Sequence, residues 1–445
     1  LPNKQARVDR FLAPRSSTQG PCPEPSLMVT FSPQSPTYLR KKKYVNYLDS
    51  NFGVLDLKPK SYAVAEYENL QNDSCSLQPW PCKPRKRRSL QLTSSVLDLP
   101  TYSYALMTEL LDWGKSDVLV AALGKTYYNW SWVDQTEVSR GYTDNLINAC
   151  KIEPSKGDVI FGTINGFELH DMNLCKRFLK RCKYCCINSI SHDYRYCEIT
   201  CLDWSPTGKS FAVGCTCGIV TSHTKDASLI NSRKVYKSDS LCRICISPDA
   251  RFVACSSFVS TALHILTWPE LKIYYILMFC GMIRTINWHP WRSSYLCVGS
   301  ITSMSLTQLT FWSATMNRIT VYAPLDTPNH INSALFSDNT GELVMSIVHN
   351  MDKSALLVLS DPYTVVDMWN KTEQTAYRDQ PSERDRIRKM MFSPDGTKLA
   401  TATAAEDLMI WHYLPEPKKK TTRNLKKFCK LPMFVDQADL GFSIR

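Results

Sequence analysis

The sequence predicts an all-β protein, a seven-bladed β-propeller, and a recurring segment carries that prediction. A stretch of about forty residues returns seven times between Leu110 and Tyr413. The clearest copy is the last, Arg388 to Trp411, where apolar residues lead into a Ser-Pro-Asp-Gly turn, an alternating strand follows, and a further strand ends on Trp. That order is the signature of a WD-repeat blade, a small four-stranded sheet.

The turn near the start of each copy gives the period. Two successive spacings are 42 residues, from Ser205 to Ser247 and from Ser247 to His289. Longer spacings fit loops inserted between blades, whereas a two-sheet sandwich predicts no fixed period. The seven turns begin at Trp113, Glu153, Ser205, Ser247, His289, Ser337 and Ser393. The matching later strands are expected to end near Trp130, His170, His223, Trp268, Trp312, Leu359 and Trp411.

Composition limits the class of protein. The chain has 445 residues, 44% of them hydrophobic, and no apolar run approaches the roughly 18 residues of a membrane span. No signal peptide is recognisable at its start. The 18 cysteines are irregularly scattered, which favours reduced thiols used as small core residues in the cytoplasm and nucleus.

One cysteine cluster could be a zinc site. Cys182, Cys185 and Cys186 lie close together in the sequence, with Cys175, Cys197 and Cys201 nearby. A structural zinc site needs four ligands on converging turns, and only one Cys-x-x-Cys pair is present. We therefore favour core and edge thiols of blades 2 and 3, and expect no metal and no cofactor.

Charge divides the chain into three parts. Residues 1–100 hold 15 Lys and Arg against 8 Asp and Glu, and residues 414–445 hold 8 against 3, so the excess of +12 lies outside the repeats. We predict a disordered basic N-terminal arm at 1–95, the propeller at 96–413, and a short basic C-terminal tail at 414–445. The basic run 83–88 reads as a solvated linker or a nuclear import signal. A neutral ring argues against nucleic-acid binding.

Three short motifs around the repeats resemble those of one family. Asp9-Arg10-Phe11-Leu12-Ala13-Pro14-Arg15 resembles the C-box of the Fizzy and Fizzy-related activators of the anaphase-promoting complex. Ser443-Ile444-Arg445 is similar to that family's Ile-Arg tail, and 96–100 followed by 110–113 matches its spacing before blade 1. Leu12 and the shifted Pro14 depart from the family pattern. The degraded blades and many cysteines look most like a divergent insect member associated with female meiosis.

The resemblance implies a function without catalysis. Members of the family recruit substrates to a ubiquitin ligase, so we expect the C-box (Asp9, Arg10, Phe11, Leu12, Pro14, Arg15) and the tail (Ile444, Arg445) to bind ligase subunits. Two weak contacts on flexible tethers reinforce each other. The alternative is a WD-repeat scaffold without a role in degradation. A phosphoinositide-binding propeller and an enzyme fit less well, because the expected basic motif, metal spacing and nucleophile–base pair are missing.

The resemblance also implies two substrate sites on the ring. The family binds the destruction box of its substrates, Arg-x-x-Leu, between the first and last blades, which by position assigns Leu97, Asp98 and Glu406 here. Two carboxylates around one guanidinium are a strong acceptor set. Cyclins and similar cell-cycle proteins are the expected substrates.

The second family site, which reads a Lys-Glu-Asn motif, is only partly kept. Thr302 and Arg386 match the family, whereas Ala105 and the segment 258–260 lack the expected acid and amides. Ligand groups left unpaired would weaken binding. We therefore predict that recognition of Lys-Glu-Asn is weak or lost.

Overall fold

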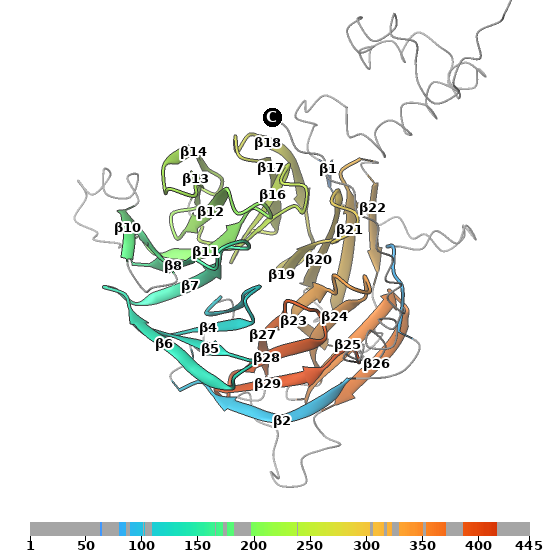
Figure 1. The fold of residues 1–445 in the computed structure, drawn as a ribbon. Coiled ribbons are helices and arrows are strands. Elements are labelled where there is room, and N and C mark those ends of the chain that lie inside the picture. Colours follow the sequence, from blue (N-terminus) through green and yellow to red (C-terminus); the bar gives the residue numbers. More distant parts are fainter. Residues whose placement is uncertain are drawn as a thin grey trace, which may run out of the picture.

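The computed structural model describes residues 63–64, 80–85, 90–100, 102, 109–164, 166–171, 176–181, 197–237, 239–302, 306–315, 318–322, 329–349, 353–370 and 386–415. Within these ranges the regular structure is entirely β, arranged as seven sheets in a ring (Figure 1). This confirms the seven-bladed propeller. The described residues include no helix that is long and apolar enough to cross a membrane.

Blades 1 to 6 are each built from four antiparallel strands that follow one another in the sequence. Blades 1 to 3 comprise β3 (Leu111–Trp113), β4 (Val118–Leu123), β5 (Thr126–Ser131), β6 (Thr136–Tyr142); β7 (Ile147–Ile152), β8 (Val159–Thr163), β9 (Gly166–His170), β10 (Lys176–Arg181); β11 (Ile199–Trp204), β12 (Ser210–Cys215), β13 (Ile219–Thr224) and β14 (Leu229–Lys234).

Blades 4 to 6 repeat this plan. They comprise β15 (Leu241–Ile246), β16 (Phe252–Ser257), β17 (Ala262–Thr267), β18 (Ile273–Met278); β19 (Gly281–Trp288), β20 (Tyr295–Thr302), β21 (Thr307–Ser313), β22 (Arg318–Tyr322); β23 (Asn329–Phe336), β24 (Leu343–His349), β25 (Lys353–Asp361) and β26 (Thr364–Asn370). The two-residue strand β1 (Ala63–Val64) adds in parallel to β18.

The turns that the repeat predicts join the first two strands of each blade. In the last copy the Ser393 hydroxyl donates to Asp395 Oδ1 at 2.5 Å, and Gly396 adopts a φ of 68°, which favours glycine. Equivalent serines begin the turns after β11 and β15. The residues expected at the later strand ends lie on or directly after the third strands, and a fourth strand completes each blade.

The first strand of every blade lines the centre of the ring, where each contacts the first strands of the blades on either side. Because strands alternate in direction, the second-to-third-strand turns and the blade-to-blade connections share one face, which we call the upper face. The start of β15 pairs with the end of β16, Leu241 opposite Ser257, and β27 (Ile387–Phe392) and β28 (Lys398–Thr403) pair likewise. The opposite face is called the lower face.

Blade 7 is completed by a strand from the other end of the chain. Its sheet order is β2, β29, β28, β27, so β2 (Gln91–Asp98) forms the outer strand beside β29 (Asp407–His412). The pairing is antiparallel, from Gln91 opposite His412 to Asp98 opposite Asp407. Figure 1 shows β2 closing the ring along the outside of β29. The propeller therefore begins before the boundary expected at residue 96.

Residues before β2 are anchored on the lower face. Trp80 is only 1% exposed. It stacks on Phe311 of β21 with ring centroids 4.9 Å apart and meets the edge of Phe336 of β23. The Lys83 amide donates to the Thr340 carbonyl at 2.7 Å. This short segment therefore belongs to the core between blades 5 and 6.

Arg85 is the polar half of this anchor. Its Nε lies 3.1 Å from Glu342 Oε2 and its Nη2 lies 3.7 Å from Asp367 Oδ2, with all three side chains buried. Its guanidinium also donates to the Tyr413 carbonyl at 2.9 Å and lies over the Tyr413 ring. The interpretation of the basic run 83–88 as a solvated linker is wrong at Arg85, because two buried carboxylates hold this cation in the ring. The nuclear import signal stays a prediction. Residues 86–88 lie outside the described part.

His289 links the anchor to blade 5 and should make it sensitive to acid. Its Nδ1 accepts from the amides of Trp291 and Arg292, so Nε2 carries the proton and donates to the Pro81 carbonyl at 2.9 Å. Burial outweighs this bond and lowers the pKa of His289 to about 4. A second proton would have to sit on Nδ1, where it would point at the Trp291 and Arg292 amide N–H groups and displace their hydrogen bonds.

Acidification from pH 6.5 to 4 is therefore expected to destabilise the fold through His289. The folded-state pKa lies below the unfolded value, so this stability is complete above about pH 6.5 and is lost as the pH falls toward 4. The loss should be on the order of 2 kcal/mol. Urea unfolding across this range should show a smaller pH dependence for His289→Gln than for the unchanged chain. Equal slopes would contradict the assignment.

A charged cluster ties three blades together inside the ring. Glu109 Oε1, just before β3, lies 3.2 Å from Arg243 Nη1 of β15 and 3.2 Å from Lys389 Nζ of β27. Burial alone would raise the pKa of Glu109, but Lys389, Lys151 and Arg243 outweigh it and lower the pKa to about 2. Glu109 is therefore ionised and bridges blades 1, 4 and 7.

Candidate functional site

The upper end of the ring closure brings the predicted residues Asp98 and Glu406 together. Asp98 is the last residue of β2, and Glu406 lies in the turn between β28 and β29. The Leu99 amide donates to the Glu406 carbonyl at 2.6 Å. Glu406 has a φ of 70°, an uncommon conformation for a residue with a side chain, so the β2 contact and the turn together set the direction of its carboxylate.

A third carboxylate belongs to the same group. Asp407 lies directly opposite Asp98 in the β2–β29 register, and like charges facing each other across a strand pair disfavour folding. Of the ion pairs that the described residues form, none includes Asp98, Glu406 or Asp407. Asp98 is exposed and the other two are half-buried. The three acids form an acidic group that can accept a cation.

An apolar surface adjoins this acidic group. Leu97 is half-buried and packs against a core cluster formed by blades 7, 1 and 2. It pairs with Leu408 of β29, which is fully buried. Leu99 and Tyr102, on the connection to blade 1, are buried in the same cluster. Because Leu97 and Asp98 are consecutive in β2, their side chains leave opposite faces of the sheet, and Leu97 faces blade 1. A ligand with a cation and a nearby apolar side chain would therefore reach over the upper edge of blade 7 to meet both partners.

The second predicted site, which reads a Lys-Glu-Asn motif in the family, departs from the family pattern at blade 4. Asp239 Oδ2 accepts from the amides of Val259 and Ser260, and the Ser260 hydroxyl accepts from Ala262. The polar groups of this turn thus bond to one another or to Asp239. Phe258 and Val259 are exposed, Val259 by 78%. The turn presents an apolar tip where the resemblance would require two amides.

The two residues that match the family at this site lie on the same upper face. The Thr302 hydroxyl accepts from the Leu306 amide at 3.3 Å, so it helps to close its own turn after β20. Arg386 directly precedes β27, and its carbonyl accepts from Ala404. Burial first, and then the charges of Arg284 and Arg386, lower the pKa of His330. Ala105 lies outside the described residues.

Other predicted contacts cannot be placed. The C-box residues 9–15 and the tail residues 444–445 lie outside the described residues. Sequence reasoning missed Asp407, although its place opposite Asp98 follows once β2 is known to pair with β29. It also missed Glu109, Trp80 and Arg85, for which no local pattern gives a signal.

The structure defines the class of protein as a seven-bladed WD-repeat propeller, and the family model "WD domain, G-beta repeat" matches residues 184–221. Over nearly its whole length the chain is similar to Protein cortex of two species. Identity is 40% to that of Heliconius erato, covering 99% of this chain and 96% of the relative, and 36% to that of Biston betularia, covering 100% and 98%. The chain belongs to the Cortex group of the Fizzy and Fizzy-related activators of the anaphase-promoting complex.

More distant similarity points the same way. "Cell division cycle 20.4, cofactor of APC complex" of Arabidopsis thaliana is 25% identical, covering 83% of this chain and 78% of the relative. A chain of the structure "Crystal Structure of Mitotic Checkpoint Complex" superposes with a TM-score of 0.59 at 19% identity, covering 78% of this chain and all of that one. The latter likeness supports the fold.

Proposed function

We propose that the chain recruits substrates to the anaphase-promoting complex by binding destruction boxes at the ring closure, in meiosis, without catalysing a reaction itself. The substrates would be cell-cycle proteins, cyclins among them, whose ubiquitination it promotes. The observation that carries this proposal is that Asp98, Glu406 and Asp407 gather at the upper edge of blade 7, where half-buried Leu97 lies on the side of blade 1. Family membership supports the coarser role of an activator.

The chemistry of the acidic group suits an Arg-x-x-Leu peptide. A guanidinium offers a planar fork of donors, and several carboxylate oxygens around it give charge-assisted hydrogen bonds. The peptide's Leu would then pack near Leu97. Binding the cation also relieves the repulsion between Asp98 and Asp407, so that part of the binding energy comes from the protein itself.

Peptide titration tests the site. Glu406→Gln and Asp98→Asn are each expected to weaken binding of a destruction-box peptide by about 10- to 100-fold, because each loses a hydrogen bond to a charged group worth about 1.5–3 kcal/mol. Fluorescence anisotropy with the full chain provides the measurement. Asp226→Asn removes an exposed acid in the turn after β13 and should leave the affinity unchanged.

A double-mutant cycle distinguishes a direct contact from a change in fold. A peptide with its Arg replaced by Ala should bind the unchanged chain weakly and should lose little further affinity to Glu406→Gln. Additive losses would mean that Glu406 does not contact the Arg, and would overturn the site.

The same assay should show weak binding of a Lys-Glu-Asn peptide. Tight binding that is lost in Arg386→Ala would contradict that expectation.

Ligase docking is proposed for the two ends of the chain. The C-box around Arg10 and the terminal Ile444-Arg445 would bind ligase subunits, and the protein would act in the cytoplasm and nucleus. Affinity purification of the full chain should recover ligase subunits, with less recovered after Arg10→Ala or removal of 444–445. Undiminished recovery would favour the WD-repeat scaffold.

A further inference from the structure

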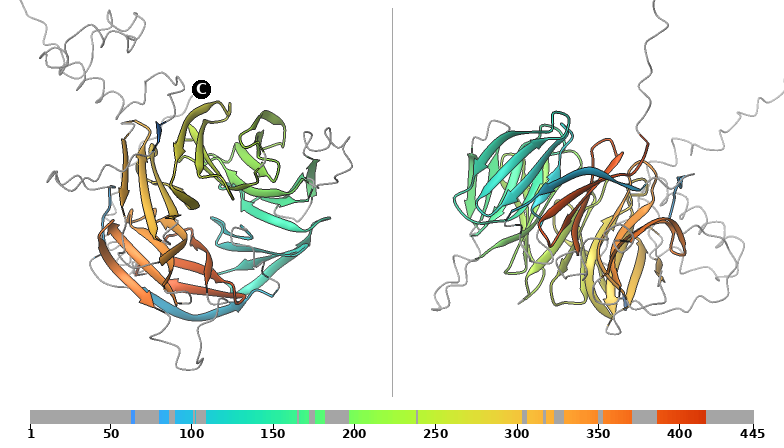
Figure 2. Two further views of the ribbon diagram at one scale, coloured as in Figure 1. Left: turned by 180° about the vertical axis from the view of Figure 1, so that it is seen from behind. Right: turned by 90° about the horizontal axis from the view of Figure 1, so that it is seen from below.

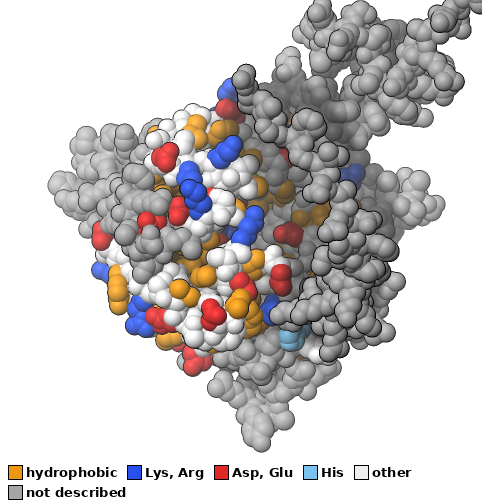
Figure 3. All heavy atoms as spheres, in the orientation of Figure 1, with side chains coloured by type: hydrophobic (Ala, Val, Ile, Leu, Met, Phe, Trp, Pro, Cys, Tyr) orange, Lys and Arg blue, Asp and Glu red, His pale blue; other side chains and the backbone are white. Residues whose placement is uncertain are grey.

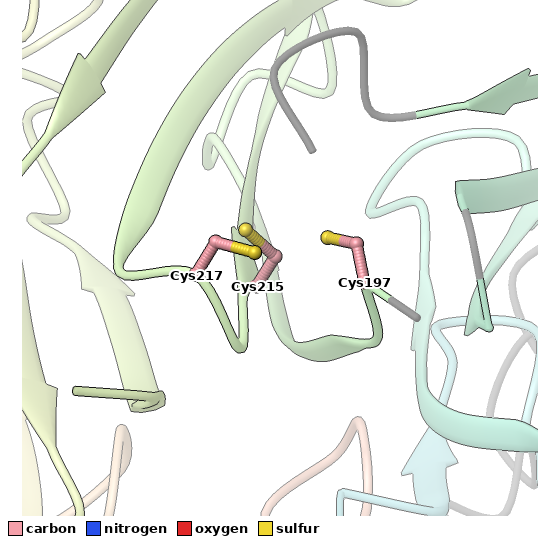
Figure 4. A group of neighbouring side chains, drawn as sticks. All are labelled: Cys197, Cys215 and Cys217. Atoms are coloured by element: carbon pink, nitrogen blue, oxygen red, sulfur yellow. The ribbon is translucent and has the colours of Figure 1, made fainter. Parts of the chain in front are cut away.

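Three cysteines gather at the upper face of blade 3. Their sulfur atoms all lie within 4.8 Å of one another, and Figure 4 shows them close together, with the thiols of Cys197 and Cys217 directed toward each other. Cys197 precedes β11, Cys215 ends β12, and Cys217 lies in the turn that follows. Two are buried and Cys217 is half-buried, so solvent reaches the group from the side of Cys217.

The backbone fixes this arrangement. Ile199 pairs with Cys215 across the β11–β12 hairpin, and the Thr216 amide donates to the Glu198 carbonyl at 2.9 Å. The Glu198 amide donates in return to the Thr216 hydroxyl at 3.1 Å. These bonds hold the approach to β11 against the turn, so Cys197 faces the Cys-x-Cys pair.

The turn itself requires glycine. The Gly218 amide donates to the Cys215 carbonyl at 3.1 Å, and its φ is 73°. A Cβ at this position would collide with the Tyr236 carbonyl oxygen. Since side chains rarely adopt this conformation, Gly218 lets Cys215 and Cys217 present their thiols to the same side. The ligand positions are thus organised before any ion binds.

No other described cysteines are arranged in this way. Across the described ranges this is the one group of three or more potential ligands that lie close enough to hold an ion. Other cysteines are buried within the blade cores, and burial raises the pKa of Cys255 and Cys297 well above the ordinary value. Those thiols stay protonated and serve as small core residues.

The spacing suits a thiophilic ion. Zinc binds cysteine sulfur at about 2.3 Å in tetrahedral geometry, which places sulfur atoms about 3.8 Å apart. Small rotations about the side-chain bonds would bring the sulfur atoms from their present separations, within 4.8 Å, to about 3.8 Å. Three thiolates favour soft or borderline ions such as zinc over calcium and magnesium.

We propose that Cys197, Cys215 and Cys217 bind one zinc ion as thiolates, with a fourth position open to a ligand from outside these three. The three thiols release three protons as the ion binds, so binding strengthens as the pH rises. The ion would clamp the connection from blade 2 onto the upper turn of blade 3. Glu198, within that connection, already bridges to Ile164 of blade 2. The sequence alone favoured plain core thiols because it holds a single Cys-x-x-Cys pair, and Cys215 and Cys217 lie outside the cluster that it suggested.

Metal analysis of the full chain tests the proposal. Chain purified under reducing conditions without chelator should hold one zinc per chain by mass spectrometry of the metals. Cys217→Ala and Cys197→Ala should each raise the zinc dissociation constant by more than about 100-fold, since even indirect partners of a metal ligand are worth about 10- to 100-fold. Cys280→Ala is the matched control, because Cys280 is an exposed cysteine on another connection of the upper face.

A second measurement covers variants that fail to fold. After chelation, adding zinc to the unchanged chain and to Cys280→Ala should raise the melting temperature, because an ion that binds only the folded state stabilises it. Cobalt should give thiolate-to-metal absorption in the same two proteins and much less in Cys217→Ala. Four outcomes would each overturn the proposal. They are the absence of stoichiometric zinc, the retention of zinc in both cysteine variants, selective loading with copper(I), and a disulfide between two of the three cysteines in chain freshly prepared under reducing conditions.

Discussion

A chain that begins at residue 96 is expected not to fold cooperatively, whereas one that begins at residue 80 should melt within a few degrees of the full chain. The longer deletion removes most of β2, leaving β29 as an open sheet edge. It also removes Trp80, whose loss from a core costs about 3–5 kcal/mol. Glu342 and Asp367 would remain buried without Arg85, and breaking a buried pair costs about 3–5 kcal/mol.

Together these losses approach the whole stability of a typical domain, about 5–15 kcal/mol. Circular dichroism melting and size-exclusion chromatography provide the measurements, with the chain from residue 80 as the matched control. That control loses β1, which adds two residues to the edge of blade 4, and keeps both the anchor and β2. If the chain from residue 96 melted like the control, the anchor and β2 would contribute little.

Glu109→Gln is expected to lower the free energy of unfolding by about 3–5 kcal/mol, because it leaves Lys389 and Arg243 buried without their counter-ion. Urea denaturation at neutral pH provides the measurement. The effect should vanish in acid. The folded-state pKa of Glu109 is about 2, below its unfolded value near 4.5, so its contribution is complete above about pH 4.5 and lost as the pH falls toward 2.

A partner substitution separates charge from packing. Lys389→Met should partly restore the stability of Glu109→Gln, because it removes one of the uncompensated cations while keeping a chain of similar length. Glu137→Gln is the matched control, because Glu137 pairs with Arg140 on an exposed strand and should change stability by less than about 1 kcal/mol. A loss of that small size for Glu109→Gln would mean that the cluster does not hold the blades together.

The sequence predicts those parts of the fold that depend on local patterns. Ser205, Ser247 and Ser393 were recognisable because Ser, Asp and Gly form the same turn in each copy, and all three begin the turns expected of them. The placement of Asp98 near Glu406 came from the family resemblance, and the Leu99–Glu406 hydrogen bond confirms that the two positions are neighbours. The peptide titration tests whether these two positions bind a destruction box.

Features that depend on strand register or on single contacts between distant residues could not be predicted from the sequence. Trp80 and Arg85 lie in a proline-containing stretch without periodicity, and each contacts residues more than 200 positions away. Asp407 became part of the acidic group only once the pairing of β2 with β29 was known. Cys197 meets Cys215 and Cys217 through one hairpin. Figure 3 shows acidic, basic and apolar side chains intermixed on the described surface of one face, in keeping with the neutral charge of the ring.

The closure of the ring also determines how it would respond to force. The chain crosses the lower face through Trp80 and Arg85, and β2 then runs along β29 to Asp98 on the upper face. Figure 2 shows β2 edge-on, lying across the outside of blade 7. Tension on the N-terminal side would first load the Trp80–Arg85 anchor and then β2 lengthwise. The hydrogen bonds to β29 would then resist together in shear, rather than opening one after another from an end. Blade 7 would thus transmit force from the N-terminal side of the chain to the edge of the upper face that carries Asp98, Glu406 and Asp407.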